Sequence, residues 1–404
     1  MRASRSGGGT WGALGAVVLG VVVFGLTLMV RGGPSGEAGL PTPSASGSFA
    51  TSSLGSFAPP SGSPSFPPSA PPAGLPPGLV DKTWVTHDPI TYGGPYVAGT
   101  LDGRYHLILP VGEHGLTAAD GRVVSVVWSF SADGSVSGTT LIVRDLRQGG
   151  AKLLELSRPG VISYALLRGD TLYFAGNWAA DGIPGVYAAS LVDGSVRTLI
   201  APAPFPSDLG EPGGRAPLHL SPSGATLGSG ICALGGVCTI QVLDLASGRL
   251  SQPLTGTRSA FWLLTDSILV TVDTVDVYGY DMAGRLRWAL TNKMATNGGG
   301  YLTSDGRQLI VLYEDQNPGE HFASIALASV DLLSGAERVL FRWPRDVVAP
   351  FLWVDASSDA VAVLIPGGIP PEEALDRGGG SFRADLFDLQ SGSLAPGALL
   401  VSER

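Results

Sequence analysis

The sequence has few of the residues from which catalytic and metal sites are commonly built. Its 404 residues include two cysteines and five histidines, and no two histidines stand at the spacing of metal ligands. The short motifs of serine hydrolases, zinc proteases, P-loop proteins and EF-hand calcium sites are all missing. The sequence therefore predicts no catalytic residue, no metal ligand and no cofactor.

Charge is also scarce, and one sign prevails. Charged residues make up 15% of the chain, the net charge is −9, and no run rich in lysine or arginine occurs. Proteins that bind nucleic acid through its phosphates need a basic face. Nucleic acid is therefore excluded as an expected partner, and the negative charge is interpreted as favouring solubility or a cationic ligand.

One long hydrophobic run stands near the N-terminus. Residues 11–30 contain no charge, and twenty helical residues span about 30 Å, the thickness of a bilayer's hydrocarbon core. Arg2 and Arg5 precede the run, so the positive-inside rule predicts a cytoplasmic segment over 1–10, a transmembrane helix over 11–30 and an exported remainder. A cleaved signal peptide is the alternative, but no A-x-A-like site follows Val30. We expect an uncleaved, single-pass signal anchor in the cell membrane.

Residues 31–79 contain little besides proline, serine and glycine. These three types fill 32 of the 49 positions, and Arg31 and Glu37 carry the only charges. Too few large apolar side chains are present to offset the entropy lost on ordering such a chain. We predict a disordered linker that holds the following domain, residues 80–404, away from the membrane.

Turn dipeptides rich in glycine, aspartate and serine recur in two alternating series after residue 96. The first series comprises Asp102-Gly103, Asp133-Gly134, Gly169-Asp170, Ser223-Gly224, Asp266-Ser267, Asp305-Gly306 and Ser358-Asp359. The second series comprises Asp120-Gly121, Gly149-Gly150, Asp193-Gly194, Ser247-Gly248, Ala283-Gly284, Ser334-Gly335 and Ser391-Gly392. The period is about 43 residues, which is typical of propellers and solenoids.

The unit over residues 218–254 shows how one repeat is built. An apolar strand ends at a Ser-Pro-Ser-Gly turn, two strands follow at 225–231 and 239–245, and the Ser247-Gly248 turn leads to a fourth. Short aliphatic strands bounded by such turns predict hairpins, and four strands per repeat make one propeller blade. A right-handed parallel β-helix, which needs shorter and more uniform coils, is the alternative fold.

We therefore predict an all-β fold, a seven-bladed (six to eight) β-propeller of four-stranded blades. The seven turn pairs give the number of blades. A strand over Lys82 to His87 is expected to close the ring beside the last blade.

The turn between the third and fourth strands has a recurring sequence. It reads Asp145-Leu146-Arg147-Gln148-Gly149, Asp244-Leu245-Ala246-Ser247-Gly248, Asp331-Leu332-Leu333-Ser334-Gly335 and Asp388-Leu389-Gln390-Ser391-Gly392, with Asp281-Met282-Ala283-Gly284 as a shortened form. Aspartate can cap such a turn through its carboxylate, and glycine supplies a positive φ. The motif resembles the turn of bacterial WD40-like, TolB-like and YVTN-type propellers. The resemblance spans about three-quarters of the chain and implies the architecture alone.

Cys232 and Cys238 flank a segment that contains Gly235-Gly236. In an exported domain, two cysteines on either side of a hairpin are well placed for a cross-strand disulfide. Metal ligation is the alternative, but no histidine pair or second cysteine pair stands nearby. We predict the disulfide.

Several hairpins between second and third strands are longer than a tight hairpin needs, namely 177–185, 314–322 and 366–382. The crossover 201–217 belongs to the same face of a propeller. Loops on a rigid scaffold commonly carry function, so we predict a binding face there. Its candidate residues are Trp178, Tyr313, Glu314, Asp315, Glu320, His321, Glu372, Glu373 and Asp376. Their carboxylates suit a cation or a basic partner, and tolerated insertions coated in charge are the alternative.

These features favour a membrane-anchored, extracytoplasmic β-propeller that acts as a binding scaffold for a protein, a peptide or a glycan. The alternative is a propeller enzyme, lactonase-like, glycosidase-like or quinoprotein-like, with its site at the central channel. Arg168-Gly169-Asp170 spells an adhesion tripeptide but occupies a turn of the repeat, so it is interpreted as structural.

Overall fold

In the computed structural model, the second part of the chain is built from β-strands. The described residues are 79, 82–87, 96–132, 134–176, 183–206, 212–233, 237–258, 261–272, 276–291, 294–295, 300–315, 324–344, 353–357, 359–366 and 381–401. The chain divides into two units, 1–66 and 67–404, and all of these residues belong to the second. The predicted cytoplasmic segment, transmembrane helix and linker lie outside the described residues, apart from Leu79. Within the described part, no helix has the length and apolar character needed to cross a bilayer.

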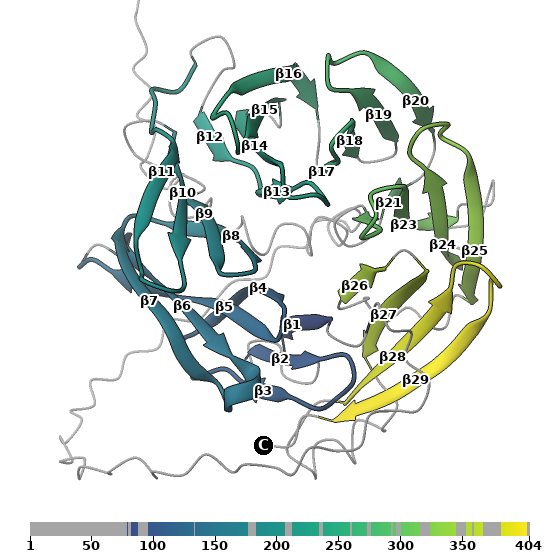
Figure 1. Cartoon of the computed structure of the whole chain (residues 1–404), viewed down its shortest axis with the longest axis horizontal. Coiled ribbons are helices and arrows are strands. Elements are labelled where there is room, and N and C mark those ends of the chain that lie inside the picture. The colour runs from purple at the N-terminus through teal and green to yellow at the C-terminus, as the bar shows by residue number, and fades with distance from the viewer. Residues whose placement is uncertain are drawn as a thin grey trace, which may run out of the picture. The chain divides into compact units, whose positions relative to one another are not determined.

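Six antiparallel sheets are arranged as blades around a central axis (Figure 1). Blade 1 contains β4 (His114–Ala119), β5 (Arg122–Phe130), β6 (Val136–Asp145) and β7 (Ala151–Pro159). Blade 2 contains β8 (Ile162–Arg168), β9 (Thr171–Gly176), β10 (Val186–Ser190) and β11 (Val196–Ile200). Blade 3 contains β12 (Pro212–Arg215), β13 (His219–Leu220), β14 (Thr226–Ala233), β15 (Val237–Asp244) and β16 (Leu250–Arg258). Blade 4 contains β17 (Phe261–Leu264), β18 (Ile268–Val272), β19 (Val277–Asp281) and β20 (Leu286–Leu290). Blade 5 contains β21 (Met294–Ala295), β22 (Tyr301–Leu302), β23 (Gln308–Asp315), β24 (Ser324–Asp331) and β25 (Glu337–Pro344). Blade 6 contains β26 (Trp353–Ala356), β27 (Ala360–Pro366), β28 (Ser381–Asp388) and β29 (Leu394–Val401).

Blades 3 and 5 are four-stranded like the others, although five strands are assigned to each. In blade 3 the innermost strand is divided into β12 and β13, and both pieces pair with β14. In blade 5, β21 and β22 both pair with β23. The predicted all-β propeller of four-stranded blades is therefore confirmed. The described residues form six such blades, and the seventh predicted blade is not shown.

A smaller, three-stranded sheet lies between blade 6 and blade 1 (Figure 1). It contains β1 (Thr83–His87), β2 (Tyr96–Thr100) and β3 (His106–Ile108). The strand predicted over 82–87 is present as β1, but it pairs with β2 along its whole length rather than with a strand of the last blade. The outer position of blade 6 is filled instead by β29, which pairs with β28.

The predicted alternation of the two turn series is wrong in the first two repeats. Asp120-Gly121 joins β4 to β5 and is thus the first turn of blade 1, while Gly149-Gly150 between β6 and β7 is its second. Gly134 lies in the β5–β6 hairpin, at the opposite end of these strands. Asp and Gly suit tight turns at either end of a strand, so composition alone does not distinguish the two ends.

From blade 2 onward, both series mark the two tight turns of a single blade. The residue after the third strand donates its backbone N–H to a carbonyl beside the first turn in five blades. These hydrogen bonds are Leu146 to Gly121, Leu191 to Asp170, Leu245 to Ala225, Leu332 to Arg307 and Leu389 to Asp359, at 2.8–3.0 Å. The end of the ring that carries these turns is termed the tight-turn face, and the opposite end the hairpin face.

The aspartates of the recurring turn cap it as predicted. Oδ1 of Asp244 accepts the backbone N–H of Ser247 at 2.7 Å, and Oδ1 of Asp331 accepts that of Ser334 at 2.8 Å. Gly248 has a φ of 70°, in the region that favours glycine. Hydrogen bonds from Ser247 to Asp244 and from Ser334 to Asp331 hold the pKa of both carboxyl groups below the usual range.

The hydrophobic core lies between consecutive blades. One cluster joins Val270 and Val277 of blade 4 to Leu309, Val311 and Ala328 of blade 5, and all five side chains are buried. Similar clusters join blades 1 and 2, blades 2 and 3, blades 3 and 4, and blades 5 and 6. Blades 2 to 5 thus bury both faces of their sheets, which is how the sequence can use apolar residues on both sides of their central strands.

Candidate functional site

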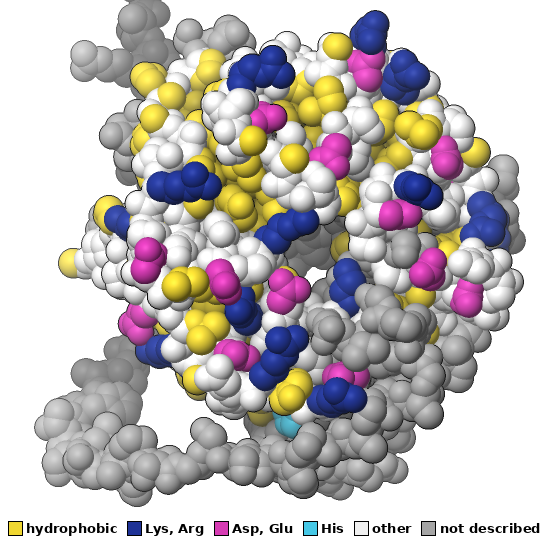
Figure 2. Space-filling view, in the orientation of Figure 1, with side chains coloured by type: hydrophobic (Ala, Val, Ile, Leu, Met, Phe, Trp, Pro, Cys, Tyr) yellow, Lys and Arg dark blue, Asp and Glu magenta, His cyan; other side chains and the backbone are white. Residues whose placement is uncertain are grey.

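On the tight-turn face, side chains link the first turns of neighbouring blades. From blade 1, Arg122 donates Nη1 to the carbonyl of Gly169 at 2.7 Å and Nη2 to Oδ1 of Asp170 at 3.0 Å in blade 2. From blade 2, Arg168 donates Nη1 to the carbonyl of Ser221 at 3.0 Å in blade 3. Basic and acidic side chains also lie near one another around the central opening in the space-filling view (Figure 2). This series of contacts is termed the turn belt.

The turn belt continues to blade 4 and stops there. Ser223 of blade 3 donates its hydroxyl to Oδ1 of Asp266 at 2.6 Å in the first turn of blade 4. Between that turn and residues 305–307 of blade 5, both of which the structure describes, no hydrogen bond or ion pair is formed. The belt is therefore open between blades 4 and 5.

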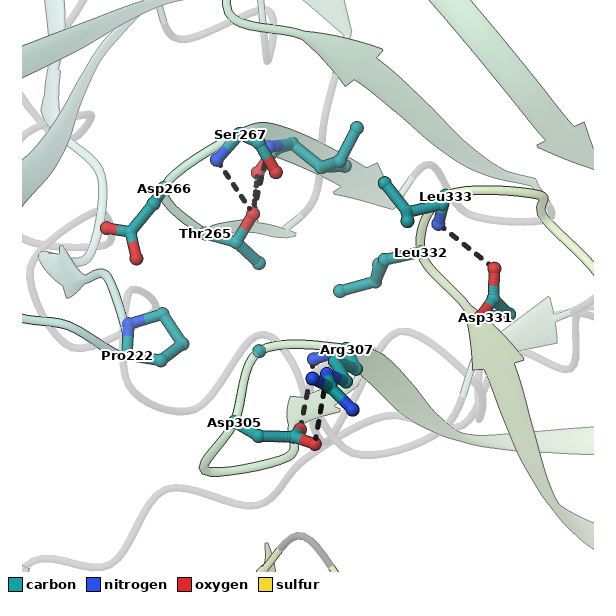
Figure 3. Close-up of a pocket in the computed structure, with 11 residues that line it drawn as sticks. Pro222, Thr265, Asp266, Ser267, Asp305, Arg307, Asp331, Leu332 and Leu333 are labelled. Carbon is teal, nitrogen blue, oxygen red and sulfur yellow. Dashed lines mark hydrogen bonds and ion pairs between the residues drawn. The ribbon is translucent and has the colours of Figure 1, made fainter.

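A pocket of about 290 Å³ lies at this opening (Figure 3). It is lined by Pro222, Thr265, Asp266, Ser267, Ile268, Asp305, Gly306, Arg307, Asp331, Leu332 and Leu333. In Figure 3, Asp266 and Ser267 lie across the pocket from Asp305 and Arg307, and Pro222 lies across it from Leu332 and Leu333. Three blades thus contribute turns to one concave site, the arrangement expected of a binding pocket.

The polar lining carries an excess of negative charge, because it has three aspartates and one arginine. Oδ1 of Asp305 accepts the hydroxyl of Thr303 at 2.6 Å and the backbone N–H of Arg307 at 3.1 Å, so this carboxylate is fixed by its own turn. Nε of Arg307 lies 3.9 Å from Oδ2 of Asp305, and its side chain is 83% exposed. An exposed ion pair at that distance contributes little, so the guanidinium can move away from the pocket at small cost.

The apolar lining includes one side chain with almost no cover. Leu333 is 76% exposed, whereas the preceding Leu332 is buried. Leu333 occupies the third position of the Asp-Leu-x-Ser-Gly turn, where the other copies have Arg147, Ala246 and Gln390. A leucine at this solvent-facing position gains nothing from folding, and it supplies an apolar rim beside the aspartates.

Those candidate residues predicted from the sequence that the structure describes do not line this pocket. Tyr313 lies in the core between blades 4 and 5 rather than on an exposed face, and its hydroxyl donates to Oε1 of Glu337 at 2.8 Å. Glu314 and Asp315 are the last residues of β23, at the hairpin face, where they pair with the start of β24. Trp178, Glu320, His321, Glu372, Glu373 and Asp376 lie outside the described residues.

The sequence did not indicate the pocket, because the recurring turn motif implied the architecture alone. The pocket residues come from four turns that are far apart in the chain, and nothing in the repeat indicates which neighbouring turns stay unlinked. The second leucine of Asp331-Leu332-Leu333 is the one signal in the sequence that marks this turn.

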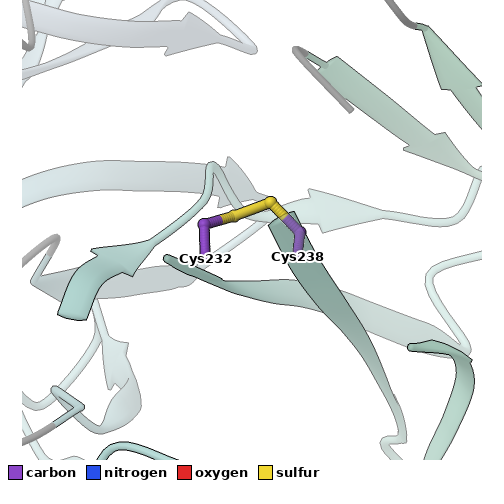
Figure 4. The surroundings of a disulfide bond; sticks show 2 residues. All are labelled: Cys232 and Cys238. Atoms are coloured by element: carbon purple, nitrogen blue, oxygen red, sulfur yellow. A yellow bond between two sulfur atoms is a disulfide. The ribbon is translucent and has the colours of Figure 1, made fainter. Parts of the chain in front are cut away.

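The predicted disulfide is confirmed. Cys232 and Cys238 are bonded and face each other across β14 and β15, with a Cα–Cα distance of 4.1 Å (Figure 4). The bond closes the end of this pair of strands at the hairpin face of blade 3. A disulfide of this kind is typical of proteins that fold in an oxidising compartment.

No family model and no curated protein matches the chain. Several solved structures resemble it. TolB from Acinetobacter baumannii is 14% identical, with a TM-score of 0.39 over 76% of this chain and 77% of that one. The chain is a β-propeller.

Two other solved structures also resemble the chain. A putative 6-phosphogluconolactonase from Bacteroides fragilis NCTC 9343 is 12% identical, with a TM-score of 0.49 over 82% of this chain and 97% of that one. The β-propeller domain of the Trilobed protease from Pyrococcus furiosus is 10% identical, with a TM-score of 0.47 over 71% and 84%. Likeness at these identities concerns the fold, and function has to be argued from the site.

Proposed function

We propose that this protein is a membrane-tethered, extracytoplasmic binding scaffold that recognises a peptide segment of a partner protein. The observation that carries the proposal is the pocket where the turn belt opens between blades 4 and 5. It combines a concave shape, an exposed leucine and an excess of carboxylates at the point where the run of linked turns from blade 1 to blade 4 ends.

The compartment is inferred from three features. The disulfide between Cys232 and Cys238 supports an oxidising environment. The uncharged run over 11–30 is long enough to anchor the chain in a membrane, and the charge-poor segment over 31–79 suits a tether. Together they favour a propeller held outside the cell membrane by an N-terminal anchor.

The chemistry of the pocket favours a basic side chain next to an apolar one. Its volume, about 290 Å³, is at the lower limit of ligand pockets, which begin near 300 Å³, so it suits one long side chain rather than a large ligand. A lysine or arginine can place its aliphatic stem along Leu332 and Leu333 while its charged end approaches Asp266 or Asp331. Such a ligand complements both the apolar and the acidic parts of the lining.

A fluorescence anisotropy titration of the full chain tests this function. The probes are two labelled peptides, acetyl-Gly-Leu-Lys-Leu-Gly-amide and the same peptide with glutamate in place of lysine. We expect the lysine peptide to bind at least tenfold more tightly. Equal affinity for the two peptides, or no binding of either, would contradict the proposal.

A matched pair of variants locates the binding. Leu333→Ser removes the exposed leucine of the pocket and is expected to weaken binding of the lysine peptide several-fold. Val192→Ser removes an equally exposed apolar residue from the corresponding turn of blade 2 and is expected to leave binding unchanged. The propeller-enzyme alternative stays a prediction, which metal analysis of the purified protein addresses.

A further inference from the structure

A buried arginine lies between blades 2 and 3. Arg215 is the last residue of β12, which pairs with residues 231–233 toward the hairpin face, and it is 4% exposed. A guanidinium removed from water to this extent is costly unless an opposite charge compensates it. Within the described part of the chain, no carboxylate forms an ion pair or hydrogen bond with Arg215.

The partners of Arg215 are neutral and do not use all of its donors. Nε donates to the carbonyl of Pro184, and Nη1 donates to Oγ of Ser229 at 2.8 Å and to Oε1 of Gln241 at 3.2 Å. A guanidinium has five N–H donors, so these three bonds leave the two donors of Nη2. Among the described residues, none accepts from Nη2.

The charge of Arg215 persists at neutral pH. Burial lowers the pKa of its guanidinium to about 10, which still leaves the group protonated at pH 7. The position therefore holds a fixed positive charge, and no described residue uses the two donors at its outer nitrogen.

Another largely buried arginine of the chain is compensated. Nη2 of Arg144 lies 2.5 Å from Oε1 of Glu113, and both side chains are shielded from solvent. Glu113 also accepts the hydroxyl of Ser125 at 2.7 Å. The fold can thus supply a carboxylate to a buried arginine, and among the described residues none is supplied to Arg215.

We propose that Arg215 forms an anion-binding site for an oxyanion group, a carboxylate or a phosphate, which accepts hydrogen bonds from Nη2. A guanidinium is suited to this role because its planar donors match the oxygens of such groups. The net charge of −9 disfavours unspecific accumulation of anions, so binding here depends on the local site. This site lies toward the hairpin face, at the end of β12, and is independent of the pocket on the tight-turn face.

Thermal unfolding of the full chain in sodium acetate and in sodium phosphate tests the proposal, with sodium chloride at equal ionic strength as reference. A ligand that binds only the folded state raises the Tm in proportion to its occupancy. We expect a saturable rise of the wild-type Tm with at least one of the two oxyanions, and the effective one identifies the group. A rise that does not saturate, or no rise with either, would overturn the site.

Two variants separate binding from stability. Arg215→Met should lower the Tm and abolish the saturable rise. Arg338→Met should keep the rise, because Arg338 also donates to a carbonyl of a neighbouring blade, that of Leu389, but is exposed. An identical rise in Arg215→Met and wild type would assign the oxyanion to another place and refute the proposal.

If Arg215→Met does not fold, hydrogen exchange of the wild type shows whether the oxyanion binds at Arg215. The effective oxyanion should slow exchange in residues 212–215 and around Ser229, and protection confined to other segments would refute the site. Arg215→Lys, which keeps the charge without the planar fork, should bind the oxyanion more weakly than the wild type does.

Discussion

Tryptophans that pack onto glycines fix the contacts between strands and between blades. Trp262 of blade 4 is 2% exposed, and its ring covers Gly228 of blade 3 so closely that a Cβ atom there would overlap the ring. Trp288 covers Gly279 in the same way, on the neighbouring strand of its own blade. Glycine is therefore required at these positions for close approach rather than for its backbone conformation.

Substitution of Gly228 by alanine should destabilise the propeller. Because the added methyl group has to displace the ring of Trp262, we expect the free energy of unfolding to fall by about 1–3 kcal/mol. Urea denaturation followed by tryptophan fluorescence measures the change. The same substitution in a Trp262→Leu background should cost less, and an alanine variant as stable as the wild type would show that the contact is not tight.

Protonation of His219 should destabilise the folded state. Its ring stands edge-on to Trp262 at 4.7 Å, and burial lowers its pKa to about 3, below the value of about 6.5 in an unfolded chain. Unfolding therefore takes up a proton between these two pH values. The contribution of neutral His219 to the free energy of unfolding is complete above pH 6.5. It is lost as the pH falls toward 3, by up to about 1.4 kcal/mol per pH unit.

Denaturation curves at pH 7.5 and pH 5 measure this effect. The loss of stability between the two should be smaller in His219→Phe than in the wild type. It should be unchanged in His106→Gln, which alters a histidine of the three-stranded sheet. An equal loss in His219→Phe and wild type would mean that this histidine does not govern the pH dependence.

Some of these residue roles could be predicted from the sequence, and others could not. The aspartates of the recurring turn could, because a carboxylate caps a turn through neighbours within three residues. Arg215 and His219 could not, because the environment of each depends on residues from more than one strand or blade. Tyr313 seemed from its place in a long hairpin to be exposed, but it belongs to β23 and points into the core.

At the scale of strands and turns, the two tight turns of a blade act as one unit. In blade 5 the N–H of Leu332 donates to the carbonyl of Arg307 at 3.0 Å, which joins the second turn to the first. From blade 2 onward each blade carries one turn of each series, so the two series of turn dipeptides occur together along the sequence. The series predicted the strands well from blade 2 onward and failed in blade 1, where Gly134 belongs to a short hairpin at the other end.

Removal of the disulfide should destabilise the end of blade 3. Cys232→Ala with Cys238→Ala opens a loop of seven residues. The unfolded chain then regains the entropy that the cross-link removed, which lowers the free energy of unfolding by about 2 kcal/mol. Alanine is preferred because the side chain of Cys238 is buried.

Chemical denaturation with and without reductant measures the effect of the disulfide. The reduced wild type should match the double variant, and reductant should not change the double variant itself. Equal stability of the oxidised wild type and the double variant would contradict a stabilising role.

At the scale of the whole molecule, the ring brings together turns that are distant in the chain. The pocket collects residues from Pro222 to Leu333, so it could not be predicted from any local pattern. The propeller architecture could be predicted, because period and turn chemistry repeat locally and blades pack only on their neighbours. The anchor over 11–30 and the exported orientation are proposals that rest on the sequence alone.

Hydrogen exchange of the full chain with and without the acetyl-Gly-Leu-Lys-Leu-Gly-amide peptide tests the central claim most directly. If the opening of the turn belt is the binding site, the peptide should slow exchange in the turns over 265–268, 305–307 and 331–333. The corresponding turns of blades 1 and 2, which the belt links, should be unaffected. Protection confined to the long hairpins on the opposite face would contradict the account and return the binding site to the residues predicted from the sequence.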